Sequence, residues 1–123
     1  MTNKKKILII DDDVTSLEVI GFLFEKHGYD VHLHTSGDFI VEKIITTNPD
    51  IILLDIMMPG LSGTEVLKMV RKDLDWDKPI VVFTALDQTE IEDLAISLGA
   101  NAVLCKPVST DRLMEVVRGF QIV

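Results

Sequence analysis

The chain has 123 residues, 47% hydrophobic and 26% charged, so length and composition predict one globular domain with a real core. The net charge of −8 argues against the broad electrostatic attraction by which nucleic-acid and anionic-membrane binders work. A single cysteine excludes an intrachain disulfide, and no apolar run approaches the roughly 20 residues of a membrane-spanning helix. We therefore expect a soluble, cytoplasmic protein that binds neither nucleic acid nor membrane directly.

The first half of the chain alternates short apolar runs with helical patterns. Residues 6–10 predict a strand, and residues 14–27 predict a helix with apolar side chains at helical spacing on one face. Residues 31–34 alternate polar and apolar side chains, which is typical of an edge strand. Ser36 can cap the next helix, which we expect to end just before Pro49, because proline cannot continue a helix.

The second half continues the same alternation. Residues 51–54 are apolar throughout, which predicts a central strand buried on both faces. Ser62 and Glu65 have the spacing of a capping box, so a helix should begin there. The remaining expected elements are a strand at 80–83, a helix from the capping pattern at 87–90 to Gly99, a strand at 101–105 and a last helix that Ser109 begins.

This strict alternation of five strands with five helices predicts the α/β class. The expected architecture is a (βα)5 three-layer sandwich, in which a parallel sheet with right-handed crossovers has helices on both faces. No linker, repeat or low-complexity stretch divides residues 1–123, so we expect a single domain with no room for an attached output domain. The apolar residues at the end of the chain leave open that it is the front part of a longer protein.

Polar side chains stand at the ends of four predicted strands. Asp11 and Asp12 follow the first strand, and Asp55 follows the apolar run at 51–54. Thr84 and Lys106 end two later strands. Because the carboxyl ends of parallel strands meet at one edge of a sheet, we expect these side chains to converge there.

The chemistry of this group points to a divalent cation and a phosphoryl group. Three carboxylates repel one another and need a cation, and donors that are all oxygen favour Mg²⁺. An ionised aspartate beside such an ion can attack phosphorus, while the Thr84 hydroxyl and the Lys106 ammonium can contact phosphoryl oxygens. Any one aspartate could simply cap a helix, but the coincidence at four strand ends favours a site.

Four short runs carry a family resemblance over essentially the whole chain: Ile-Leu-Ile-Ile-Asp-Asp-Asp, Leu-Leu-Asp-Ile-Met-Met-Pro-Gly, Val-Phe-Thr-Ala and Cys-Lys-Pro. Together they resemble the response-regulator receiver domain of two-component signal transduction, in particular a stand-alone, chemotaxis-regulator-like one. The resemblance implies a flavodoxin-like sheet with strand order 2-1-3-4-5.

The resemblance also implies roles for individual residues. Asp55 would be the phosphoacceptor, and Lys106–Pro107 would be a cis peptide, which is a minority form of roughly 5–6% of such bonds. Thr84 and Lys106 would contact the phosphoryl group. The implied Mg²⁺ ligands are Asp12 directly, Asp11 largely through water, Asp55, and Met57 through its backbone carbonyl.

The implied function is a switch rather than an enzyme that turns over a substrate. A histidine kinase or phosphotransfer protein would donate its phosphoryl group to Asp55 after meeting the first helix. The surface formed by the fourth helix, fifth strand and fifth helix would then recognise a protein target. Such a chain catalyses only its own phosphorylation and dephosphorylation.

The chain departs from the family pattern in places. Val103 stands where many receivers carry an aromatic residue whose rotamer follows phosphorylation, so the usual coupled switch cannot operate. Met57 and Leu86 cannot hydrogen-bond an attacking water, which predicts a slowly hydrolysing aspartyl phosphate. Cys105 lies in an apolar run and is expected to be an inert core residue.

Two other functions compete with the switch. The spacing Asp11-x-Asp13-x-Thr15 fits the nucleophile motif of haloacid-dehalogenase-type phosphatases, with Asp11 as nucleophile. Against this enzyme, no acidic pair follows Lys106, no cap insertion is present and Asp55 would have no role. A binding module that works without phosphorylation is disfavoured by the intact acidic, threonine and lysine positions. Asp13 is expected to belong to the start of the first helix.

Overall fold

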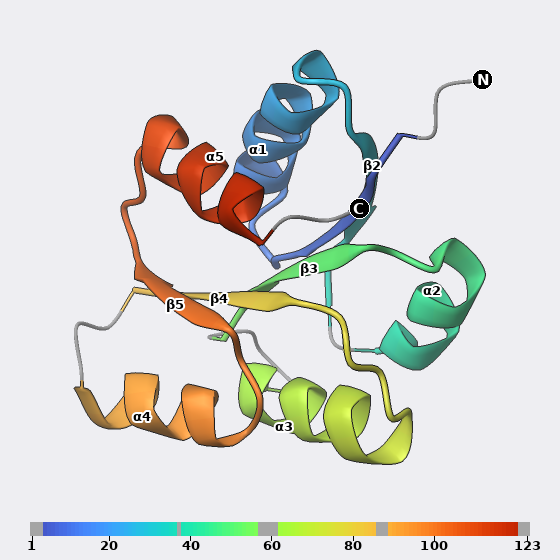
Figure 1. The fold of residues 1–123 in the computed structure, drawn as a ribbon, viewed down its shortest axis with the longest axis vertical. Helices are drawn as coiled ribbons and strands as arrows, with labels where there is room; N and C mark the ends of the chain where they lie inside the picture. The colour runs from blue at the N-terminus through green and yellow to red at the C-terminus, as the bar shows by residue number, and fades with distance from the viewer. Residues whose placement is uncertain (1–3, 37, 57–61, 86–88, 121–123) are drawn as a thin grey trace.

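The structure is a computed structural model that describes residues 4–36, 38–56, 62–85 and 89–120. Within these ranges, strands and helices alternate along the chain as the sequence predicts (Figure 1). The strands are β1 (Lys6–Ile10), β2 (Asp30–His34), β3 (Ile51–Asp55), β4 (Ile80–Thr84) and β5 (Ala102–Cys105). The helices are α1 (Val14–Lys26), α2 (Ile40–Thr47), α3 (Gly63–Lys68) with a π-helical turn at Met69–Asp73, α4 (Thr89–Ser97) and α5 (Thr110–Gly119).

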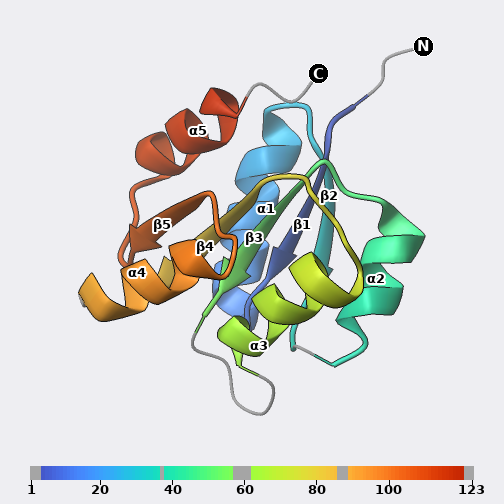
Figure 2. The ribbon, with the colours of Figure 1, turned by 60° about the horizontal axis from the view of Figure 1, so that its bottom comes forward.

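The described strands form one parallel sheet in the order β2-β1-β3-β4-β5, which confirms the predicted topology. Helices α1 and α5 cover one face, and α2, α3 and α4 cover the other (Figures 1 and 2). The fold is therefore the expected three-layer, flavodoxin-like α/β sandwich. Among the described residues, no helix combines the length and apolar character that crossing a membrane requires.

Alternation along the central strands builds a separate core on each face. In β3, Ile51 and Leu53 face α1 and α5, whereas Ile52 and Leu54 face the other helices. Every residue of β3 and β4 is buried. Because both faces of these strands are covered, their sequences are apolar up to the one polar residue that ends each strand, instead of alternating with polar residues.

The predicted cap of the second helix is wrong. That helix begins at Ile40, and Phe39 at its cap position has φ 59 and no capping hydrogen bond from its side chain. The Ser36 hydroxyl instead accepts a hydrogen bond from the Asp38 amide at 3.2 Å. A serine side chain that bonds an amide two residues on stabilises a local turn, so the chain turns before the helix starts.

The predicted burial of Cys105 is also wrong. Cys105 is the last residue of β5, a strand at the edge of the sheet, and its side chain is exposed. On an edge strand the period-2 alternation gives one side chain to the core and the next to solvent. Leu104 takes the buried position next to it.

Candidate functional site

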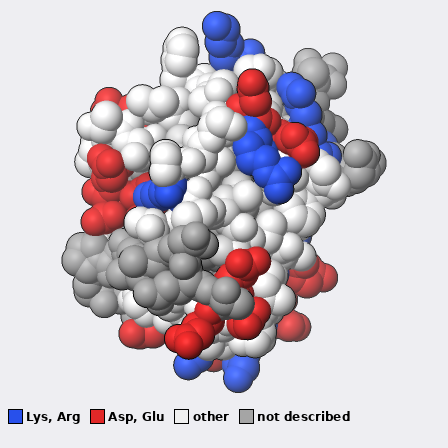
Figure 3. Space-filling model, turned by 90° about the vertical axis from the view of Figure 1, so that its left-hand side faces the viewer, with Lys and Arg blue, Asp and Glu red and all other residues white. Residues whose placement is uncertain are grey.

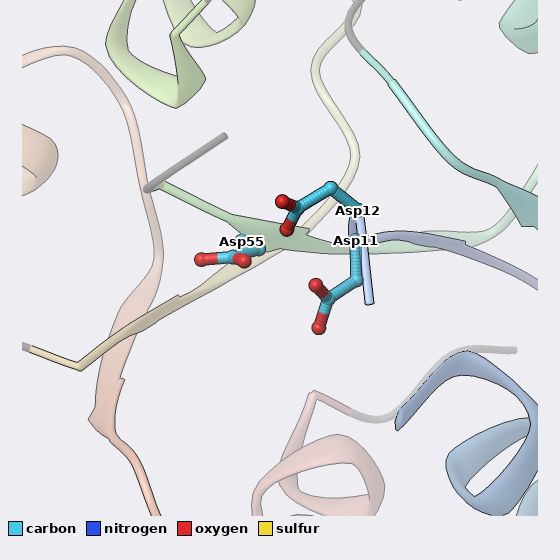
Figure 4. Close-up of side chains that lie close together, drawn as sticks. All are labelled: Asp11, Asp12 and Asp55. Carbon is cyan, nitrogen blue, oxygen red and sulfur yellow. The ribbon is translucent and has the colours of Figure 1, made fainter. Parts of the chain in front are cut away.

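Three carboxylates converge at the carboxyl-terminal edge of the sheet. Asp11 directly follows β1 and Asp55 ends β3, and these strands pair in parallel, with Ile10 opposite Leu54. One oxygen from each of Asp11, Asp12 and Asp55 lies within 4.8 Å of the others (Figure 4). Asp11 and Asp55 are only 2% and 4% exposed, whereas Asp12 is exposed. The strand ends thus bring these three side chains together, as the sequence predicts.

Lys106 supplies a positive charge to the buried pair. Its Nζ atom lies 3.1 Å from Oδ2 of Asp11 and 3.4 Å from Oδ2 of Asp55. Burial alone would lower the pKa of Lys106, but the hydrogen bond with Asp11 and the charges of Asp55 and Asp11 outweigh it and raise that pKa. The Lys106–Pro107 peptide bond is cis, as expected.

Thr84 lies at the same edge, at the end of β4. Phe83 pairs with Asp55, so Thr84 stands one residue beyond the level of the carboxylate on the neighbouring strand. It is 3% exposed, and its carbonyl accepts a hydrogen bond of 2.7 Å from the Lys106 amide. The β4 and β5 ends are therefore joined at the point where the lysine turns toward the aspartates. Met57 lies outside the described residues.

Asp13 has a separate role, at the start of α1. Its Oδ1 accepts from the Thr15 amide at 3.1 Å, and its Oδ2 accepts from the Ser16 hydroxyl at 2.9 Å. The hydrogen bonds from Ser16 hold the pKa of Asp13 below its usual range. Its expected place at the helix start is confirmed, and the third position of the Asp11-x-Asp13-x-Thr15 pattern is used as a helix cap.

Gly63 is a further residue of the site, which the pattern analysis missed. It begins α3, its amide donates to the Ile56 carbonyl at 3.1 Å, and a Cβ atom here would lie 2.3 Å from the Ile56 Cα. Only glycine therefore allows α3 to pack directly against the backbone that follows Asp55. The only related signal in the sequence is the Ser62 cap next to it. That cap indicates the start of a helix, but not that the helix packs closely against the backbone after Asp55.

The family model of the response regulator receiver domain matches residues 7–118. The chain belongs to this family. Among solved structures, a CheY-like receiver domain protein from Methanospirillum hungatei is 28% identical with a TM-score of 0.88, covering 95% of this chain and 93% of that one. The BeF3-activated N-terminal receiver domain of RstA from Klebsiella pneumoniae is 32% identical with a TM-score of 0.88, covering 94% and 97%. The receiver domain of response regulator 1452 from Francisella is 32% identical with a TM-score of 0.87, covering 95% and 96%.

Membership places the chain among the receiver domains of two-component response regulators, which are not classical enzymes. Receiver domains bind Mg²⁺ through acidic residues, and they interact with histidine kinases or phosphotransfer proteins and with effector targets. The side chains of this receiver fit such an ion. Three carboxylate groups gather here, Lys106 pairs with two of them, Asp11 and Asp55, and the donors are all oxygen.

Proposed function

We propose that residues 1–123 act as a single receiver domain whose Asp55 accepts a phosphoryl group from a phosphohistidine donor. In this step, an Asp55 oxygen forms a bond to phosphorus as the bond between phosphorus and the donor's imidazole nitrogen breaks. The electron pair stays on that nitrogen, which takes up a proton. The observation that carries the proposal is a nearly buried carboxylate beside two further aspartates and one lysine.

Asp11, Asp12 and Asp55 are the residues that would hold Mg²⁺, with the Met57 carbonyl as a further ligand. When bound, the ion offsets negative charge on the phosphoryl oxygens. Lys106 and Thr84 contribute without the ion: the lysine brings a positive charge to Asp55, and the threonine hydroxyl stands at the end of the adjacent strand. We expect both groups to donate hydrogen bonds to phosphoryl oxygens on Asp55.

We assign the docking of the donor to α1 and the start of α5. A groove of about 610 Å³ lies between them, lined mainly by apolar side chains, and it reaches Lys106. Val19 of α1 lines this groove and is 58% exposed, and Phe22 of the same helix is 68% exposed, so α1 presents apolar side chains to solvent. An apolar helix of a phosphohistidine protein seated here would place its imidazole at the carboxyl-terminal edge of the sheet, where Asp55 lies.

The target would bind the surface formed by α4, β5 and α5. Figure 3 views this side of the molecule and shows uncharged surface between a group of charged side chains in the upper part and acidic side chains in the lower part. The exposed acids Glu90, Glu92 and Asp93 lie on α4, and Arg112 lies on α5, where it pairs with Glu115. Val103 of β5 is half-buried against the core, so the proposed switch of this surface operates without an aromatic rotamer. A cytoplasmic location suits this exchange between proteins.

Locating the phosphoryl group tests the proposal. The protein is incubated with acetyl phosphate and Mg²⁺, reduced with borohydride, and mapped by peptide mass spectrometry. We expect the reduced product, which we call the label, at position 55 in wild type. It should be absent in Asp55→Asn and fully present in the matched control Asp13→Asn. Label on Asp11 would instead indicate the phosphatase chemistry, and absence of label with retained folding would refute phosphoryl acceptance.

A further inference from the structure

Arg71 is the centre of a hydrogen-bonded cluster that lies at the opposite end of the strands from the aspartates. It belongs to the π-helical turn Met69–Asp73 that follows α3. All five of its N–H groups donate hydrogen bonds. The acceptors are the Gly99 carbonyl at 3.0 and 2.9 Å, the Trp76 and Lys78 carbonyls at 2.7 Å each, and Oδ1 of Asn101 at 2.8 Å.

The acceptors lie in two connections at the amino-terminal edge of the sheet. Trp76 and Lys78 precede β4, and Gly99 and Asn101 lie between α4 and β5. Asn101 adds two bonds to the first residue of β4, because its Oδ1 accepts from the Ile80 amide at 2.9 Å and its amide donates to the Ile80 carbonyl at 2.8 Å. We call Arg71 and these acceptors the Arg71 cluster. A lysine, with three donors and no planar fork, could not reproduce it.

Gly99 shows that the cluster determines the local backbone. Its φ is +108, a conformation that side-chain-bearing residues rarely adopt. A Cβ atom at this position would also lie 2.7 Å from Cγ of Arg71. The end of α4 and the arginine therefore fit together only with glycine at position 99.

The two ends of α4 differ in how many of their side chains are buried. Near its carboxyl end, Ala95 and Ala100 are buried and Leu98 packs against the core. Toward its amino end, the described side chains from Glu90 to Leu94 are exposed, apart from the half-buried Ile91. Among the described residues of α4 and the turn after it, the buried side chains and the Arg71 hydrogen bonds thus lie at the end that meets the Arg71 cluster, although Ile96 and Ser97 there are exposed. A segment with few buried contacts opens most readily.

We propose that the Arg71 cluster anchors the carboxyl end of α4 and the start of β5, so that α4 pivots about this end. A change at Thr84 or Asp55 would then displace the amino end of α4 while the Gly99 end stays fixed to the sheet. The inference rests on the proposed function for its trigger, but the anchor itself exists in the unphosphorylated protein. Arg71 is a positioning residue in this device, because it does not touch the reacting atoms.

Hydrogen exchange followed by mass spectrometry tests the anchor without any trigger. In Arg71→Lys we expect exchange of residues 97–101 to rise at least about tenfold, with less than about a threefold change in β1 and β3. The matched control Lys72→Met, which removes the neighbouring exposed cation, should exchange like wild type. Gly99→Ala should reproduce the Arg71→Lys pattern by pushing the arginine away. Unchanged exchange at 97–101 in both variants would overturn the proposal.

The pivot is tested by adding acetyl phosphate and Mg²⁺ to the same samples. In wild type, phosphorylation should alter exchange in residues 90–94 and leave residues 97–101 within about twofold of their unphosphorylated rate. In Arg71→Lys the change should spread to 97–101. An equally large change at both ends of α4 in wild type would refute the pivot. If intact mass shows no phosphoryl group on the protein, the proposed function fails, and the trigger-free comparison still decides the anchor.

Discussion

The two edges of the sheet each hold a partly buried cation, and the pKa values of these cations move in opposite directions. At the carboxyl-terminal edge, burial opposes the charged form of Lys106, but Asp11 and Asp55 outweigh it and raise its pKa. At the amino-terminal edge, burial lowers the pKa of Arg71, with a smaller opposing effect from Asp77. The guanidinium faces neutral oxygens, while the ammonium faces carboxylates.

The contrast indicates that another cation can bind the partners of Lys106 but not those of Arg71. We call Lys106 the replaceable cation and Arg71 the permanent cation. The carboxylates around Lys106 would also accept Mg²⁺, because carboxylate oxygens are ligands of this ion as well as partners of an ammonium group. The four oxygens around Arg71, one of which accepts two hydrogen bonds, are arranged to fit one planar fork, so no simple cation could substitute. One edge is therefore suited to exchange of partners and the other to fixed structure.

The largest effect is expected when the permanent cation is removed. Arg71→Met leaves five hydrogen bonds unmade and several carbonyls without a partner, so the free energy of unfolding should fall by about 3 kcal/mol. Urea unfolding followed by far-UV circular dichroism measures this. If Arg71→Met lowers the free energy of unfolding no more than the exposed control Lys72→Met does, the distinction between the two edges is refuted.

Removing a carboxylate should weaken Mg²⁺ binding and change the free energy of unfolding only a little. Asp12 is exposed, and one of its oxygens lies within 4.8 Å of an oxygen of Asp11 and of Asp55, so Asp12→Ala should weaken Mg²⁺ binding about a hundredfold. Isothermal titration calorimetry reports the affinity. The matched control is Asp13→Ala, which loses a helix cap and keeps the three carboxylates. Equal affinity in Asp12→Ala and wild type would contradict the proposed ligand set.

Removing the replaceable cation should have the opposite effect on the same measurement. Lys106→Met frees Asp11 and Asp55 from an ammonium that competes with the ion, so we expect Mg²⁺ to bind about tenfold more tightly, or about 1.4 kcal/mol. The labelling of Asp55 should nonetheless slow, since the phosphoryl group loses a donor. Weaker Mg²⁺ binding in Lys106→Met would show that the lysine supports the ion instead of competing with it.

A smaller effect is expected on the lifetime of the phosphorylated state. Met57 is apolar, and Met57→Asn would offer a hydrogen bond of about 1 kcal/mol to an attacking water, which corresponds to about fivefold faster decay of the aspartyl phosphate. The decay of phosphorylated protein after removal of acetyl phosphate measures it, with Met57→Leu as the control. Identical decay in all three proteins would count against the hypothesis.

The smallest effect concerns pH in the absence of metal. Because the folded state raises the pKa of Lys106, its stabilising contribution is complete below the unfolded pKa of about 10.4 and disappears as pH rises through the folded value. The contribution should be at most about 1 kcal/mol, since the side chain is 30% exposed. The difference in unfolding free energy between wild type and Lys106→Met should therefore shrink above about pH 10. A difference that instead grows toward high pH would reverse this sign.

Most of the fold could be predicted because its signals are local and periodic. The apolar runs of β3 and β4 mark central strands, and capping residues such as Ser62 and Ser109 mark helix starts correctly. Ser36 misled because the same hydroxyl can stabilise a turn or a helix start, and only the surrounding backbone decides between them. The exposure of Cys105 depends on which side of an edge strand remains uncovered, which is a tertiary property.

The two edges also differ in how far the sequence predicts them. Asp11, Asp55 and Lys106 could be placed together because each directly follows or ends a strand of a parallel sheet, and sheet geometry then sets their meeting point. The Arg71 cluster could not, because an arginine that bonds backbone carbonyls leaves no pattern in residue types. Its partner Gly99 was interpreted only as a helix end.

Trp76, the one tryptophan of the sequence, stacks beside the permanent cation, with its ring centroid 5.7 Å from the guanidinium carbon of Arg71. The fluorescence of Trp76 therefore reports on one defined place in the structure. A change in the emission spectrum reports loosening of the amino-terminal edge or unfolding of the whole domain, whereas the phosphoryl chemistry proposed for Asp55 belongs to the opposite edge. In this protein the single tryptophan reports on the anchor, and a second, introduced dye near the amino end of α4 would be needed to report on the proposed switch.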